Sequence, residues 1–407
     1  MIEHFAETLF RESIHLRNRI AAREMAFGDG AIASVTEELS TDLLNELQVS
    51  NRLWNDFQEP QLQETINTLK RCTPLERAYF QRFFTFVSKE QILSKTGGKN
   101  DSSNGFAGLW HTPLAEKIES GNILLGLTVT EKRQSGPGKG YDIIELHIPQ
   151  QGEDFLPNFR TGDIIIFYAY QKEPDVRQQI LMKGNILDIQ ANSLTILLRN
   201  GQQNKDIIGG ADEVFAVEHD SSDSSAMNAM RGLYAFLSAR TDRKELLLGL
   251  RTPGKHPERT LNGSYGRFDE LILKEKQTDD YFLLVGPPGT GKTSCALRYM
   301  VEEALTDPEA SLLLLSYTNR AVDEICSMLV DSGIAESTPF IRIGSELSCD
   351  KRFAPYLLKN SLADCPKLTD IQQKIAHTRI FTGTTTAINS RLHLFNLKHF
   401  TLAIIDE

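Results

Sequence analysis

The stretch VGPPGTGKTSCAL (285–297) follows an apolar run, YFLLV (281–285), and leads into a helical pattern. It fills every position of the pattern GxxxxGK[ST] in the order that a phosphate-binding loop requires. Its glycines let the backbone curl so that N–H groups face a phosphate, and the helix that follows points its positive dipole end at the same anion. The stretch therefore predicts a P-loop. The predicted nucleotide-binding residues of this loop are Gly286, Pro287, Pro288, Gly289, Thr290, Gly291, Lys292 and Thr293.

The chemistry of a nucleoside triphosphate assigns roles to particular side chains. We expect Lys292 to reach the β and γ phosphates and the hydroxyl of Thr293 to bind Mg²⁺. The run TLAIIDE (401–407) supplies the acidic residues at the end of an apolar strand. Asp406 is predicted to hold the metal, and Glu407 to deprotonate the attacking water. The sequence therefore predicts an ATP hydrolase with ATP and Mg²⁺ as cofactors and with Lys292, Asp406 and Glu407 as catalytic residues.

Apolar strand-like runs alternate with helical stretches from Tyr281 onward, which is typical of βαβ units and a parallel sheet. A helix ahead of them is indicated by apolar residues spaced i, i+3, i+4 and i+7 from Met230 to Leu237. We therefore predict an α/β domain over 226–407. Its expected strands are YFLLV (281–285), SLLLLS (311–316), FIRI (340–343), RIFTGT (379–384) and TLAIID (401–406).

The region from 106 to 217 has a different pattern, with short alternating strands between turn signals. In it, Ile123, Leu125, Leu127 and Val129 are predicted to share one face, and SGPGKGYD (135–142) is predicted to form a hairpin tip. Strands at this spacing favour a small antiparallel β-barrel. The expected strands are NILLGLTVT (122–130), YDIIELHI (141–148), GDIIIFYAY (162–170), QQILMKGNILDIQ (178–190) and SLTILLR (193–199).

Residues 1–95 have a helical texture, as in TDLLNELQVSNRLWNDF (41–57) and LERAYFQRFFTFVSKEQIL (75–93). A polar, glycine-rich break, TGGKNDSSNG (96–105), separates them from the barrel and is typical of a linker. The sequence thus predicts three parts: a helical N-terminal region over 1–95, a barrel over 106–217 and the α/β domain over 226–407. A protein-docking role for residues 1–95 is a further hypothesis, and no motif in the sequence tests it.

Length and composition narrow the class of protein. A chain of 407 residues with 40% hydrophobic and 24% charged residues is long enough for two or three globular domains. Its net charge of -10 argues against a protein that coats nucleic acid through bulk charge. Five scattered cysteines form no metal-binding spacing, and no stretch has the length of a signal peptide core or a membrane span. A soluble cytoplasmic protein without a membrane partner is therefore the expectation.

Two features choose among the P-loop families. Lys292 and Asp406 lie 114 residues apart, whereas AAA+ ATPases share the wording GPPGTGKT but place their acidic strand much closer. The stretch LLLLSYTNRAVDEI (312–325) resembles the motif of superfamily 1 helicases in which a Thr-Asn pair touches a single strand. FTGTTTAINS (381–390) looks like the Thr-rich motif of the same family. An ordinary βα loop with an Asn helix cap is the alternative explanation of TNRAVDE.

The resemblance is closest to superfamily 1B helicases, the branch that holds the nonsense-mediated-decay RNA helicase and the eukaryotic replication helicase–nuclease. It is specific over about 260–407 and looser over 106–250, where the strands are similar to the family's accessory barrel. It implies a RecA-like ATPase domain that contacts single-stranded DNA or RNA, with 5′ to 3′ polarity. The residues that it implies as nucleic-acid contacts are Thr318, Asn319 and Thr385.

One position departs from the family pattern. The adenine-reading motif upstream of the P-loop runs LNxSQ in the family, and here it reads LNGSY (261–265). Tyr265 is therefore the expected nucleotide-binding residue at the base, where glutamine would bond adenine on two edges. A tyrosine can stack or form one hydrogen bond, so we predict that the protein tolerates other nucleoside triphosphates.

Helicases of this family bind their nucleotide between two RecA-like domains, and the second one supplies arginines to the transition state. This sequence contains the first domain up to its acidic motif. The resemblance thus leads us to expect a second RecA-like domain in the full-length protein and little hydrolysis by these 407 residues alone. The alternative function is a non-motor P-loop switch, or an AAA+-type ATPase, whose nucleotide state controls partner binding.

Overall fold

The computed structural model describes residues 64, 67–96, 108–152, 155–210, 213–220, 224–287 and 289–406. Its contacts divide the chain into two units, Met1–Arg240 and Thr241–Glu407, and each is described by itself. The predicted helical stretch 41–57 and most of the polar break 96–105 lie outside the described residues. None of the described helices combines the length and the apolar composition needed to cross a bilayer.

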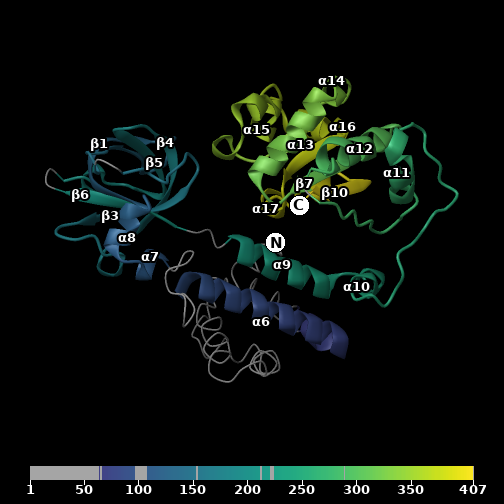
Figure 1. Ribbon diagram of the computed structural model, residues 1–407, viewed down its shortest axis with the longest axis horizontal. Helices are drawn as coiled ribbons and strands as arrows, with labels where there is room; N and C mark the ends of the chain where they lie inside the picture. Colours follow the sequence, from purple (N-terminus) through teal and green to yellow (C-terminus); the bar gives the residue numbers. More distant parts are fainter. Residues whose placement is uncertain are drawn as a thin grey trace. The chain divides into compact units, whose positions relative to one another are not determined.

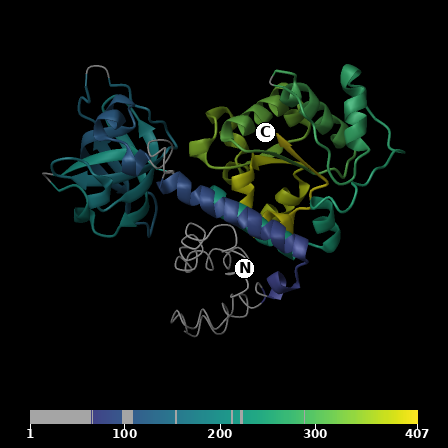
Figure 2. The ribbon, with the colours of Figure 1, turned by 60° about the horizontal axis from the view of Figure 1, so that its bottom comes forward.

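Two long helices pair in the first unit. Helix α6 (Pro74–Thr96) contains the predicted helical stretch 75–93, and α9 (Ser224–Ser238) follows the barrel in the chain (Figure 2). The rings of Tyr79 on α6 and Phe236 on α9 lie 4.8 Å apart between centroids, and the two helices pack against each other. Burial of one apolar face of each helix stabilises the pair, since helices of this length are marginal alone.

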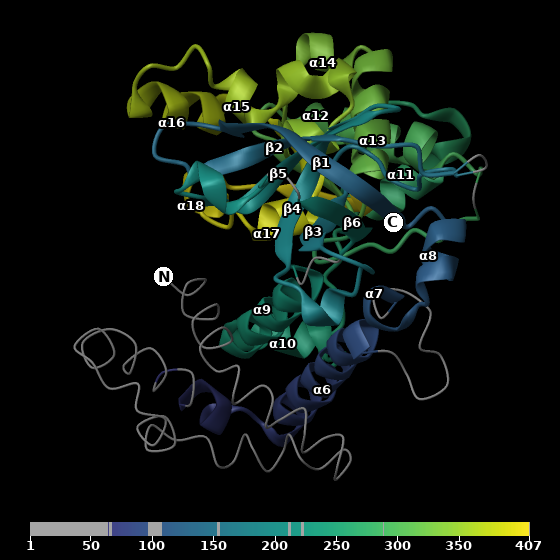
Figure 3. The same ribbon diagram turned by 90° about the vertical axis from the view of Figure 1, so that its left-hand side faces the viewer.

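The barrel forms as predicted and is closed, with strand order β1-β2-β5-β4-β3-β6 (Figure 3). All its pairs are antiparallel, and their inward side chains form one buried apolar core that includes Ile144, Leu146 and Ile196. The stretch 135–142 joins β1 to β2 as a hairpin tip, as expected. The bounds are β1 Ile123–Gln134, β2 Tyr141–His147, β3 Ile164–Tyr170, β4 Met182–Ile189, β5 Ser193–Gln202 and β6 Val214–His219, with helices α7 Gly108–His111, α8 Leu114–Glu119, η3 Val176–Gln178 and η4 Lys205–Ile207.

The prediction that four alternate residues of β1 share one face is wrong. Gly126 has a φ of 68°, and the pairing of β1 with β6 shifts between Leu124 and Leu127. A residue in the left-handed region ends the simple alternation, as in a β-bulge. Leu127 and Val129 therefore pack on the barrel core, whereas Ile123 and Leu125 pack in the separate cluster that contains residues of α7 and α8.

The second unit contains a parallel sheet, as predicted, with strand order β10-β7-β9-β8, and this sheet lies between two layers of helices (Figure 1). One face packs on α12 and α13, where Val301, Val322 and Ile325 are fully buried. The other face packs on α16, α17 and α18. The strands are β7 Leu312–Ser316, β8 Phe340–Ile343, β9 Ile380–Thr384 and β10 Leu402–Asp406. The helices are α10 Thr241–Leu247, η5 Gly266–Phe268, α11 Asp269–Lys276, η6 Lys292–Leu297, α12 Arg298–Leu305, α13 Asn319–Asp331, α14 Ile334–Ser337, η7 Glu346–Ser348, η8 Lys351–Tyr356, α15 Leu358–Ser361, α16 Leu368–His377, α17 Thr385–Asn389 and α18 Leu394–Leu397.

The strand predicted over 281–285 is not formed. These residues pair with no strand within the described parts of the chain, and the side chains of Leu283 and Val285 are 78% and 93% exposed. A β-strand is stable only when a neighbouring strand takes its backbone hydrogen bonds. The segment therefore has the alternating apolar residues of a strand but no hydrogen-bonded neighbouring strand. Among the described strands, β10 pairs on one side with β7.

Candidate nucleotide site

The P-loop turns from the segment 281–287 into a helix. Gly289 and Gly291 have φ angles of 79° and 84°, which residues with a Cβ rarely adopt. Helix η6 begins directly after Gly291 and has a wide first turn of the π type. The N–H groups of Cys295 and Ala296 both donate to the carbonyl oxygen of Gly291, each at 3.0 Å. The glycines thus make the tight turn and the helix start that the sequence predicts.

The side chain of Lys292 folds back over the loop. Its Nζ donates to the carbonyl oxygen of Gly286 at 2.6 Å and more weakly to that of Pro287 at 3.4 Å. Thr290 Oγ1 donates to the same Pro287 oxygen at 2.8 Å. The ammonium group therefore lies against the turn, where an incoming phosphate can replace the carbonyl oxygens with charged acceptors. Pro288 lies outside the described residues.

The two residues predicted to bind the metal are brought together. Thr293 Oγ1 on η6 donates to Asp406 Oδ2 at the end of β10, at 2.6 Å, across 113 residues of chain. A hydroxyl and a carboxylate oxygen are hard ligands of the kind that Mg²⁺ prefers, so the donor set fits the predicted ion. Glu407, the predicted base, lies outside the described residues.

Glu303 on α12 is a buried acceptor that the sequence reading missed. Its side chain is 2% exposed and accepts from Lys276 Nζ at 2.5 Å and from the backbone N–H groups of Asn262 and Gly263 at 2.8 and 3.0 Å. Burial alone raises the pKa of Glu303, but the hydrogen bonds from Lys276, the Asn262 N–H group, Tyr265 and the Gly263 N–H group outweigh it and lower the pKa to about 2. The carboxylate thus anchors the loop 261–265 to the helix that follows the P-loop.

Tyr265 also belongs to this anchor. Its hydroxyl donates to Glu303 Oε2 at 2.7 Å, and burial together with that carboxylate raises the pKa of the phenol. Its ring lies 5.2 Å from that of Tyr299, which in turn lies 5.5 Å from that of Phe268. Because a carboxylate can only accept, the phenolic proton is committed to Glu303 and is not available to a nucleobase.

The residues predicted to contact nucleic acid follow the ends of two neighbouring strands. Thr318 comes after β7 and caps α13, since its Oγ1 accepts from the N–H group of Ala321 at 3.2 Å. Asn319 is the first residue of that helix, and both side chains are exposed. Thr385 begins α17 after β9 and is half-buried. Parallel strands end at one edge of a sheet, so these three residues lie at the same edge as Asp406.

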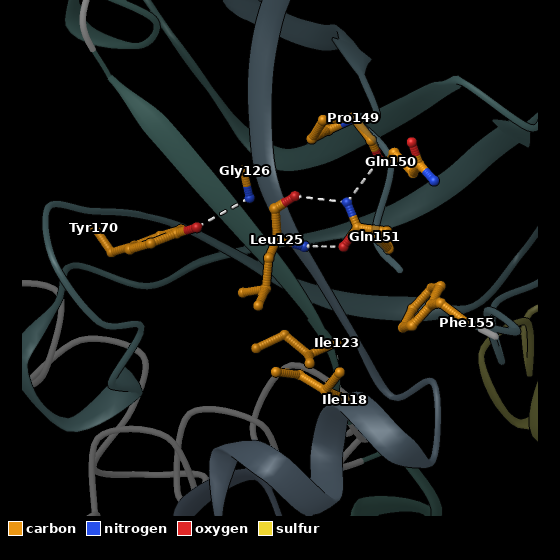
Figure 4. A pocket seen from close by; sticks show the side chains of 9 residues that line it. All are labelled: Ile118, Ile123, Leu125, Gly126, Pro149, Gln150, Gln151, Phe155 and Tyr170. Atoms are coloured by element: carbon orange, nitrogen blue, oxygen red, sulfur yellow. Dashed lines mark hydrogen bonds between the residues drawn. The ribbon is translucent and has the colours of Figure 1, made fainter. Parts of the chain in front are cut away.

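A separate pocket of about 250 Å³ opens beside the bulge of β1 in the barrel (Figure 4). Its polar groups bond one another: Gln151 bonds both the N–H and the carbonyl group of Leu125, and Tyr170 Oη accepts from the N–H group of Gly126. These contacts satisfy the backbone groups that the bulge removes from the strand ladder. The pocket is lined by Ile118, Ile123, Leu125, Gly126, Pro149, Gln150, Gln151, Phe155 and Tyr170.

The buried side chains of Glu303, which holds the loop 261–265, and Ser316, which is in register with Asp406, were not singled out from the sequence. Glu303 lies in VEEAL (301–305), an ordinary amphipathic helical stretch. Ser316 ends an apolar strand within the stretch 312–325, whose resemblance to helicases assigns a role only to Thr318 and Asn319. Only the distances between elements reveal what these side chains face, so no local signal could have identified them.

Comparison with known proteins gives matches to helicases. A model of a family described as an AAA domain matches residues 269–379. The chain is 36% identical over 138 residues to the DNA replication ATP-dependent helicase/nuclease JHS1 of Arabidopsis thaliana, a match that covers 34% of this chain and 10% of that protein. It is 25% identical over 342 residues to the DNA replication ATP-dependent helicase/nuclease DNA2 of Mus musculus, covering 78% of this chain and 30% of the relative.

A third relative is named as an RNA helicase, whereas the first two are named for DNA replication. The RNA helicase Mov10l1 of Homo sapiens is 27% identical over 128 residues, covering 31% of this chain and 10% of the relative. The chain thus spans at most about a third of the length of these three relatives.

Proposed function

We propose that this chain, which belongs to the superfamily 1B, DNA2/NAM7-like family of helicases, is the part of an ATP-dependent helicase or translocase that binds Mg-ATP and single-stranded nucleic acid. The observation that carries the proposal is the contact between Thr293 and Asp406. It joins the P-loop helix to the acidic strand at the edge where the predicted nucleic-acid residues also lie.

The proposed roles follow from the donors present. Lys292 binds the β and γ phosphates, and the P-loop N–H groups surround them. Thr293 and Asp406 hold Mg²⁺, which would neutralise the charge of the phosphates when bound. Glu407 would be the general base that deprotonates the attacking water. An arginine from a second RecA-like domain completes the site in this proposal, since arginine fingers in other NTPases raise turnover by roughly 10³–10⁵.

The proposed nucleic-acid contact is a backbone contact at the ends of β7 and β9. The exposed Thr318 and Asn319 have hydroxyl and amide groups there, and Thr385 follows the end of the neighbouring strand β9. Phosphate contacts do not distinguish DNA from RNA, and the relatives include both DNA and RNA helicases by name. Over 104–217 the barrel has 10 basic against 14 acidic residues, so we expect a shallow salt dependence of binding.

Nucleotide binding is the first test of the proposal. We expect Lys292→Ala to weaken binding of a fluorescent ATP analogue at least about tenfold, because a charge-assisted pair between the half-buried ammonium group and phosphate is worth more than about 1.4 kcal/mol. Lys274→Ala is the matched control, since that lysine is 62% exposed and pairs with Glu270 on α11. Equal binding by wild type and Lys292→Ala would contradict the proposed P-loop role.

Single-strand binding separates the helicase from a non-motor switch. We expect the double variant Thr318→Ala, Asn319→Ala to lose single-strand affinity while keeping its affinity for Mg-nucleotide, since both side chains are exposed beyond the end of β7. Fluorescence anisotropy with labelled DNA and RNA oligonucleotides measures this. A wild-type chain that binds Mg-ATP but neither oligonucleotide would favour the switch.

A further inference from the structure

Three residues with polar side chains stand in register where β10, β7 and β9 end. Asp406 pairs with Ser316, and Ser316 pairs with Thr384. Residues in register on neighbouring parallel strands direct their side chains to the same face, with strands about 4.8 Å apart. The row therefore places a serine hydroxyl between the acidic residue of the proposed metal site and the threonine that caps α17.

The hydroxyl of Ser316 is buried without a partner. The residue is 0% exposed, and its Oγ has no hydrogen bond with any group in the described parts of the chain. A buried hydroxyl left unpaired is costly, so a built-in acceptor or donor within reach is to be expected. Thr384 Oγ1 accepts from the N–H group of Ala387, which leaves its own proton able to point toward Ser316.

Asp406 has no paired strand on the side of β10 that faces away from β7 in the described parts of the chain. It ends β10, a strand that β7 alone pairs within the described residues, and the preceding Ile405 is 65% exposed. Thr293 Oγ1 donates a hydrogen bond to Oδ2 of the carboxylate, and no hydrogen bond to Oδ1 occurs among the described residues. Because Ser316 and Asp406 are in register on neighbouring strands about 4.8 Å apart, a rotation of the Ser316 side chain about its Cα–Cβ bond can bring its hydroxyl within hydrogen-bonding reach of the carboxylate.

We propose that Ser316 is a positioning residue of the metal site: its hydroxyl, unpaired in the metal-free chain, donates to Asp406 when Mg²⁺ binds and holds the carboxylate in the orientation that binds the metal. The inference rests on the proposed function, and it adds a residue that does not itself touch nucleotide. Groups that orient a metal ligand commonly change metal affinity by 10- to 100-fold when removed. Ser316 also lies two residues before Thr318, so the same strand end serves the metal site and the proposed nucleic-acid contact.

Titration of Mg²⁺ into the full chain with a fluorescent ATP analogue tests this inference. We expect Ser316→Ala to weaken the apparent Mg²⁺ affinity about tenfold, with affinity for the metal-free nucleotide within about twofold of wild type. The melting temperature without ligands should stay equal or rise, because an unpaired buried hydroxyl is removed. Ser316→Thr keeps the hydroxyl and should retain most of the Mg²⁺ affinity.

Ser311→Ala is the matched control. Ser311 is also buried, and its Oγ is also without a hydrogen-bond partner among the described residues, but it lies before the opposite end of β7. Mg²⁺ affinity in Ser316→Ala equal to wild type, or an equal loss in Ser311→Ala, overturns the inference. A wild-type chain that does not bind Mg-ATP overturns the proposed function itself, and the inference with it.

Discussion

At the scale of single residues, Tyr265 shows how a substitution within a motif changes the use of a side chain. Its hydroxyl donates to the buried Glu303 at 2.7 Å and so cannot donate to a base. We expect Tyr265→Phe to cost roughly 1–2 kcal/mol of stability, because Glu303 loses a donor, and to leave the ratio of ATP to GTP affinity unchanged. Tyr265→Gln should raise that ratio. Competition binding measures it, and an unchanged ratio in Tyr265→Gln would defeat the tolerance prediction.

Glu275 on α11 gives a prediction for pH. Burial and then the neighbouring Glu303 carboxylate raise the pKa of Glu275 to about 7, from its usual 4.5. Between pH 4.5 and 7 the folded state keeps a proton on Glu275 that the unfolded state has released. The contribution of this group to the free energy of unfolding is therefore fully present below pH 4.5 and is lost as the pH rises through 7. We expect Glu275→Gln to remove this loss, gaining roughly 1–3 kcal/mol over wild type at pH 8.

Urea denaturation at pH 5 and pH 8 measures the effect. Glu270→Gln on the same helix is the control, since the side chain of Glu270 is 81% exposed. It should show no gain at pH 8. A Glu275→Gln variant with the same difference from wild type at both pH values would mean that Glu275 is ionised throughout.

At the scale of secondary-structure elements, two glycines of the first unit have opposite expected effects. Gly126 has a φ of 68° in β1, and a Cβ there would lie 3.2 Å from Pro149 Cγ. We expect Gly126→Ala to destabilise the barrel by roughly 1–2 kcal/mol. Gly232 is exposed inside α9 with nothing within 4 Å of a Cβ, so Gly232→Ala should stabilise by roughly 0.5–1 kcal/mol. Thermal melts of the two variants compare them directly, and a stabilised Gly126→Ala would show that the bulge is dispensable.

At the scale of the whole molecule, the prediction concerns turnover by the 407-residue chain. In the proposal, the arginines of a second RecA-like domain complete the site, so these residues alone should hydrolyse ATP slowly and unwind no duplex. Phosphate release with and without single-stranded oligonucleotides measures this, and Lys292→Ala supplies the background rate. Robust strand-stimulated turnover by this chain would show that its own residues are sufficient.

The sequence alone determined the features whose chemistry is local. The glycines at 289 and 291, the lysine and threonine that follow, and the alternation of strands and helices identify a P-loop on a parallel sheet, because each depends on neighbouring residues only. The barrel followed from period-two patterns and turn signals for the same reason. The strand expected over 281–285 failed because a strand also needs a partner, which its own residues cannot specify.

Only the tertiary structure decided which distant groups meet. Thr293 and Asp406 were both assigned to Mg²⁺ from the P-loop pattern and the apolar strand before Asp406, but their contact depends on a sheet that brings residues 113 positions apart to 2.6 Å. Glu303 lies in no motif, and Ser316 lies in the stretch 312–325 but is given no role by it, since burial and hydrogen bonding are properties of the packed molecule. The sequence thus predicted a class of chemistry from local motifs, and packing decided which distant side chains meet, because hydrogen bonds act over about 3 Å in space, whatever the separation along the chain.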